Sequence, residues 1–175
     1  MVMLPVLLLA AALGPGAPPL EFAGVVFNET SLNAVVERFG QATRWQTGDA
    51  GESETKVCYV VQTRMGPRDV YFISGELWVG EIVYGVRITP AGDRRCAAAR
   101  RNRAALGAAI NGFANETAVK RRLKSLGFAK EKPGQWWRCF QEPLHGETSD
   151  RCFSVSATWR QGALIRFELW ETETN

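Results

Sequence analysis

A short block that occurs twice is the strongest constraint on how this chain can fold. Residues 27–40 read FNETSLNAVVERFG, and residues 113–127 read FANETAVKRRLKSLG. In both blocks Asn-Glu-Thr precedes apolar residues at helical spacing, and a glycine closes the block, which predicts a capped amphipathic helix. Chance matching of common residues is the competing explanation. The first hypothesis is therefore a chain built from two copies of a helix-containing module.

The helix start has two interpretations within each block. Asn-Glu-Thr is a glycosylation acceptor in a secreted protein, but an asparagine at this position also caps a helix. We expect Asn28 and Asn115 to be the N-caps, with Thr30 as a close alternative in the first copy. Phe27 and Leu32 then have the spacing of a hydrophobic staple.

The match between the copies resumes downstream at a different spacing. The first copy has about six extra residues in the polar loop TGDAGESE, an insertion that costs little because loop-closure entropy grows slowly with length. Beyond that loop the aligned pairs are Cys58 with Cys139, Phe72 with Phe153, Val83 with Leu164 and Ile88 with Leu169.

Strand patterns follow each predicted helix. Apolar residues at 153, 155, 157 and 159 alternate with serine or threonine, which is typical of a strand with one buried face. We expect WWRCFQ, DRCFSVSATW and ALIRFELWE to be strands, with counterparts in the first copy, and short strands EFAGVVF and AAINGFA before the helices. The predicted fold class is α+β, with two tandem repeats, each a helix packed on a small antiparallel sheet.

The remaining segments complete the expected domain organisation. Residues 1–17 are uncharged and apolar over about 13 positions, too short for a membrane-spanning helix but typical of a signal peptide. No positive residue precedes this run, so a disordered apolar leader is the alternative. We expect module one at residues 18–90, a basic linker with an exposed helix at 91–109, and module two at 110–175.

Four cysteines are consistent with export to an oxidising compartment. We favour a bond between Cys139 and Cys152, which would brace a protruding hairpin, and a second bond between Cys58 and Cys96, which would tie the linker to the first sheet. A bond between Cys58 and Cys139, or free buried thiols, are the alternatives.

The two helix blocks, each followed by a polar loop and antiparallel strands, resemble the small module of the SmpA/OmlA family of outer-membrane assembly lipoproteins. In its doubled layout the chain resembles the beta-lactamase inhibitory proteins, over roughly residues 22–170. The Gly-Met that commonly precedes the helix threonine in the family is absent from both copies, and so is the lipid-anchor cysteine. The resemblance implies a non-catalytic protein-binding module, and it identifies no contact residue.

Aromatic and arginine side chains in the second module are the candidate partner-binding residues. Strand alternation places Trp170 opposite Phe167 and Leu169, on the side away from the helix. The predicted binding residues are Trp136, Arg138, Phe140, Arg166 and Trp170 on an open sheet face, together with His145 in the hairpin loop. Packing between the two modules is an equal alternative for the aromatic residues, and an exposed loop position is the alternative for His145.

The sequence offers little support for catalysis or for binding of a metal or cofactor. No catalytic constellation can be assembled around His145, the only histidine, and no familiar metal-ligand spacing or cofactor motif is present. The net charge of +3 is too small to indicate nucleic acid. The basic linker arginines and Lys120, Arg121 and Lys124 form either a solvated face or a surface for an acidic partner or an anionic envelope surface.

These patterns together predict a periplasmic or secreted protein that binds another protein. The favoured function is that of an inhibitor or immunity protein that occludes its partner with the sheet face and protruding loops. The alternatives are an envelope assembly or scaffold factor and, third, a hydrolase.

Overall fold

A computed structural model describes residues 20–49, 53–75, 81–144 and 147–173. The predicted signal peptide and His145 lie outside these residues. No helix in the described ranges is long and apolar enough to cross a membrane.

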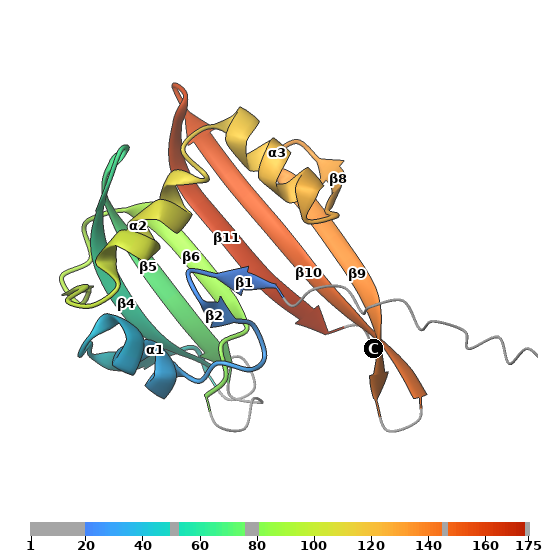
Figure 1. Cartoon of the computed structure of the whole chain (residues 1–175), viewed down its shortest axis with the longest axis horizontal. Helices are drawn as coiled ribbons and strands as arrows, with labels where there is room; N and C mark the ends of the chain where they lie inside the picture. The colour runs from blue at the N-terminus through green and yellow to red at the C-terminus, as the bar shows by residue number, and fades with distance from the viewer. Residues whose placement is uncertain (1–19, 50–52, 76–80, 145–146, 174–175) are drawn as a thin grey trace, which may run out of the picture.

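One large sheet dominates the fold, with strands in the order β3-β4-β5-β6-β11-β10-β9-β8 (Figure 1). Neighbouring strands along this order are antiparallel, and short β7 runs parallel to β4 as the ninth strand. The strands are β3 Arg44–Thr47, β4 Glu54–Thr63, β5 Gly66–Gly75, β6 Gly85–Pro90, β7 Ala97–Ala98, β8 Ala129–Lys132, β9 Gln135–Leu144, β10 Glu147–Arg160 and β11 Ala163–Glu173.

Three short helices cover one face of this sheet, which we call the helix face (Figure 1). They are α1 Leu32–Phe39, α2 Arg103–Asn111 and α3 Glu116–Ser125. A separate hairpin of β1 Glu21–Phe22 and β2 Val25–Val26 lies on the same side. No helix of the described residues lies on the other side of the sheet, which we call the open face.

The predicted fold class of two repeats, each with its own small sheet, is wrong. The last strands of the two halves, β6 and β11, pair with each other through Val86–Leu169 and Ile88–Phe167, so that one continuous sheet forms. Pairing satisfies the backbone groups that two separate sheets would leave exposed at these edges. The molecule is mostly strand, and its short helices lie on a shared sheet.

The hydrophobic core is continuous across the junction of the two halves. Phe113 joins them, because its ring lies 6.2 Å from that of Phe22 and 4.4 Å from that of Phe167. Phe72, in the first half, packs at 5.5 Å against the ring of Phe39 from α1. Burial of these aromatic side chains stabilises the fold, together with the aliphatic residues of the same core.

The two predicted helix caps have different outcomes. Asn115 caps α3 as expected, with its Oδ1 accepting a 2.9 Å hydrogen bond from the Ala118 N–H. In the first copy the cap is Ser31, whose Oγ accepts from the Ala34 N–H at 3.2 Å, so neither Asn28 nor Thr30 has that role. Asn28 instead adopts a left-handed conformation, with φ of 63°, and donates a hydrogen bond to Glu171.

The segment predicted as a basic linker is part of the folded structure. It contributes β7 and most of α2, whose Leu106 and Ile110 are fully buried, so the expectation of an exposed helix is wrong. Residues 108–111 of the predicted strand AAINGFA end this helix instead. Two apolar side chains one turn apart are enough to hold α2 on the core without a wide apolar stripe.

Candidate functional site

A row of side chains on the open face crosses the sheet from β3 to β9. Residues directly opposite each other on paired strands project from the same face of a sheet. Following the register, the row runs through Trp45, Lys56, Ile73, Gly85, Trp170, Ser154 and Trp137. Tryptophans therefore stand near both ends of the open face and close to its middle.

Trp170 occupies the middle of this row because its neighbour on β6 is a glycine. A Cβ at Gly85 would lie only 2.3 Å from Cε3 of Trp170, so the ring covers the space that a side chain would fill. The guanidinium carbon of Arg87 lies 5.3 Å from the Trp170 ring centroid, and the Tyr84 ring lies at 5.6 Å. Trp170 is thus fixed between aromatic and cationic neighbours.

A polar hollow of about 290 Å³ lies on the open face beside this row. Trp45 forms one wall, with its ring packed edge-on against Tyr71 at 6.2 Å and with Arg95 stacked over it at 4.5 Å. The full lining is Trp45, Thr47, Lys56, Tyr71, Arg87, Thr89, Asp93, Arg95 and Arg166. The hollow therefore offers flat aromatic surfaces together with cationic hydrogen-bond donors.

Ion pairs hold the cations of the hollow in place. Arg87 and Arg166 both donate to Oε1 of Glu168, at 2.6 and 2.7 Å. Burial of Glu168 opposes its ionisation, but the hydrogen bonds from Arg166 and Arg87 outweigh this effect and lower its pKa. Two guanidinium groups thus share one carboxylate, and they keep donors for a further acceptor.

A second ion pair brings a loop residue into the hollow. Arg95 donates to both carboxylate oxygens of Asp93 at 2.9 and 2.8 Å, and these bonds lower the Asp93 pKa to about 2. The Tyr71 hydroxyl also donates to Asp93, at 3.2 Å. Burial of Tyr71 and the nearby charges of Asp93 and Asp69 raise the pKa of this hydroxyl, which keeps it a donor.

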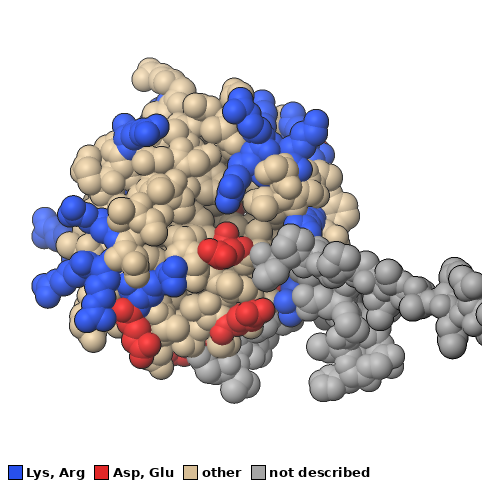
Figure 2. Space-filling model, in the orientation of Figure 1, with Lys and Arg blue, Asp and Glu red and all other residues tan. Residues whose placement is uncertain are grey.

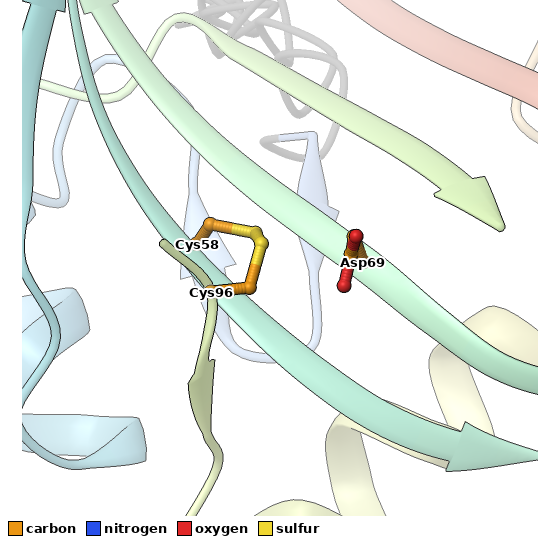
Figure 3. Close-up of side chains that lie close together, drawn as sticks. All are labelled: Cys58, Asp69 and Cys96. Carbon is orange, nitrogen blue, oxygen red and sulfur yellow. A yellow bond between two sulfur atoms is a disulfide. The ribbon is translucent and has the colours of Figure 1, made fainter. Parts of the chain in front are cut away.

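The loop that carries Asp93 and Arg95 is anchored at two points, which are Asp69 and the Cys58–Cys96 disulfide (Figure 3). Buried Asp69 on β5 accepts hydrogen bonds at 2.8 Å from the backbone N–H groups of Gly92 and Asp93. The disulfide between Cys58 on β4 and Cys96 holds the far end of the loop. Cys58, Asp69 and Cys96 place three possible metal-ligand atoms within 4.8 Å of one another. Cysteine binds metals as a thiolate, and both sulfurs are bonded to each other, so these residues act as a structural clip in the oxidised protein.

Both disulfides have the pairing that the sequence favoured. Cys58 is bonded to Cys96, and Cys139 is bonded to Cys152. Cys139 and Cys152 are direct partners on β9 and β10, so the second bond cross-links that hairpin. Each half of the sheet therefore carries one bond, which starts from β4 in the first half and from β9 in the second.

The predicted partner-binding residues do not form a single cluster. Trp170 and Arg166 lie on the open face, as expected. Trp136 is 4% exposed and packs edge-on against Trp159 at 6.3 Å, in the core on the helix face. Arg138 has the same phase on β9 and donates to the Leu126 carbonyl at the end of α3, so the open-face placement of Trp136 and Arg138 is wrong.

Two further predicted residues lie beyond the described side chains. Phe140 belongs to β9 with its side chain outside the described part, and His145 lies wholly outside it.

Sequence reasoning missed the most exposed aromatic residue of the open face. Trp137 is 49% exposed, and it is the only large hydrophobic residue found exposed in the described part of the chain. Its Cα partner Ser154 is also the partner of Trp170, which places Trp137 in the same row. Strand alternation alone could not identify it, because either of two adjacent tryptophans can be the one that faces outward.

Comparisons with protein-family models, with curated proteins and with solved structures find no match to this chain. The open face is therefore the basis of the functional proposal.

Proposed function

We propose that this is an exported, non-catalytic binding protein of inhibitor or immunity type, which occludes a partner protein with its open face. The observation that carries the proposal is the composition of that face. Tryptophan, tyrosine and arginine are the residues that most often dominate the binding energy of protein interfaces. Trp45, Tyr71, Arg87, Trp137 and Trp170 all project from that face, on which no helix of the described residues packs.

The span of the row fits a partner protein. Trp45 on β3 and Trp137 on β9 are separated by six strand intervals. At about 4.8 Å per interval, the row is about 29 Å long. A typical interface buries about 800 Å² on each partner, which corresponds to a patch roughly 28 Å on a side.

The two disulfides support the export part of the proposal, since such bonds persist in oxidising compartments outside the cytosol. The two helix blocks resemble the SmpA/OmlA module, and this resemblance also favours a non-catalytic protein-binding function.

Affinity capture with matched variants tests the proposal. The full chain is immobilised and exposed to envelope extract and culture medium, in parallel with the double variant Trp137→Ala, Arg166→Ala. Both side chains are about half exposed, so the substitutions should leave the melting temperature nearly unchanged. Arg103→Ala, an exposed change at the start of α2, is the control.

The expected result is a protein recovered with the wild type and the control but reduced by roughly 30-fold or more with the double variant, the effect of losing a hot spot. The captured protein is then purified and its activity measured with increasing amounts of this chain. Loss of that activity supports an inhibitor, whereas unchanged activity and co-purifying membrane proteins favour the assembly factor. Equal recovery by all three proteins would refute the open-face proposal.

A further inference from the structure

The helix face carries a dense group of cations over α3 and β8 (Figure 2). We define the α3–β8 patch as the exposed residues Lys120, Arg121, Arg122, Lys124, Lys130 and Lys132. The acidic residues within the same two elements are Glu116 and Glu131, which leaves an excess of four positive charges. The whole chain has a net charge of only +3, so charge is strongly segregated towards this patch.

Internal pairing accounts for little of this charge. Lys120 pairs with Glu116 at 2.6 Å, one turn away on α3. Arg121, Lys124, Lys130 and Lys132 make no ion pair with any residue in the described part of the chain. Lysines on the edge strand β8 also discourage sheet-to-sheet aggregation, but that role does not extend to the cations of α3.

We infer that the α3–β8 patch docks the protein on an anionic lipid surface. Groups of four to eight Lys and Arg residues bind anionic headgroups through charge alone. A protein partner would call for apolar or aromatic anchors, and protein interfaces are depleted in lysine. The one large hydrophobic residue found exposed among the described residues, Trp137, lies on the opposite side of the sheet.

Docking through this patch leaves the open face accessible. α3 lies on the helix face, so a lipid surface beneath α3 and β8 would turn the aromatic row towards solvent. Membrane attachment and partner binding are therefore compatible, but the lipid inference does not depend on the proposed protein-binding function. It rests only on the charge and exposure of the patch.

Vesicle sedimentation tests the inference with two variants of equal net charge. The full chain is mixed with vesicles of phosphatidylcholine containing about 30% phosphatidylglycerol, and separately with pure phosphatidylcholine, at low ionic strength where surface charge is least screened. The patch variant is Lys120→Gln, Arg121→Gln, Lys124→Gln, which retains good helix formers. The control is Arg94→Gln, Arg100→Gln, Arg103→Gln, three exposed positions of the other basic group.

The expected result is binding to the anionic vesicles only, weakened at least tenfold in the patch variant and less than about twofold in the control. Equal loss in both variants would show a response to net charge alone and would overturn the inference. So would unchanged binding in the patch variant, or an absence of binding by the wild type. Patch-dependent binding to polyglutamate without vesicle binding would overturn it in favour of an acidic protein. Circular dichroism of each variant verifies folding.

Discussion

Replacing Gly85 by alanine tests whether the Trp170 ring lies across β6. The added Cβ would stand 2.3 Å from Cε3 and 2.6 Å from Cζ3 of that ring. These separations are about 1 Å or more below van der Waals contact, so the ring or the strand must move. Overpacking of this kind costs about 1–3 kcal/mol, and removing a strand glycine returns about 0.5–1 kcal/mol. We expect a net destabilisation of about 1–2 kcal/mol.

Urea unfolding followed by far-ultraviolet circular dichroism measures this loss, with Gly92→Ala as the matched control. No atom lies within 4 Å of a Cβ at Gly92, so its change in unfolding free energy should stay within about 0.5 kcal/mol. The decisive measurement repeats Gly85→Ala in a Trp170→Ala background, where the obstructing ring is gone. There the substitution should be neutral or stabilising, giving a coupling energy of roughly 1–3 kcal/mol. An equal loss in both backgrounds would refute the proposed contact.

Buried contacts elsewhere give three further expected outcomes. Tyr59→Phe removes the 2.6 Å hydrogen bond from a buried hydroxyl to the Gly40 carbonyl, so urea unfolding should show a loss of about 1–2 kcal/mol. Changing Cys58 and Cys96 to serine opens a loop with a sequence separation of 38, which should cost about 4 kcal/mol relative to the oxidised wild type. The lowered Glu168 pKa means that its ion pairs stabilise the fold fully above the ordinary value of 4.5 and lose this effect as pH falls through the folded value. Glu168→Gln should therefore flatten the fall in unfolding free energy of the wild type between about pH 5 and 3.

The elements with local signals were predictable from the sequence. Asn115 as a helix cap, Gly127 in a left-handed conformation with φ of 79°, and the alternation of residues 153–159 all depend on neighbours within a few positions. The first helix start was mispredicted for a tertiary reason. Asn28 is drawn into a hydrogen bond with Glu171, 143 residues away, and Ser31 caps the helix instead.

The single sheet could not be predicted from strand patterns. Whether β6 ends a small sheet or pairs with β11 depends on a contact between residues about 80 positions apart, such as Arg87 with Glu168. Alternation defines the faces of each strand, but it carries no information about which strand lies beside it. The burial of α2 could not be predicted for the same reason, because it depends on the neighbouring strand β4 and not on a broad apolar stripe in the helix itself.

Trp170 and Arg166 were predicted on the correct face of the sheet, whereas Trp136 and Arg138 were predicted on the wrong one. The error has a simple cause. Trp170 was assigned to the open face from its phase relative to Phe167 and Leu169, and the structure confirms that phase. Trp136 and Trp137 are adjacent, and strand alternation alone did not show which of the two rings faces outward. The prediction named Trp136, which is the buried one. Because side chains alternate with a period of two, an error of one residue moves the predicted site to the opposite face.

Some of the contacts that join the two halves of the sheet also build the proposed binding face. Gly85 and Arg87 belong to β6, whereas Arg166, Glu168 and Trp170 belong to β11. The Arg87–Glu168 ion pair and the Gly85–Trp170 contact therefore cross the junction, and two separate sheets would have neither of them. A change that weakens this junction should reduce stability and partner binding together, whereas a change at Trp137, near the far end of the row, should reduce binding alone.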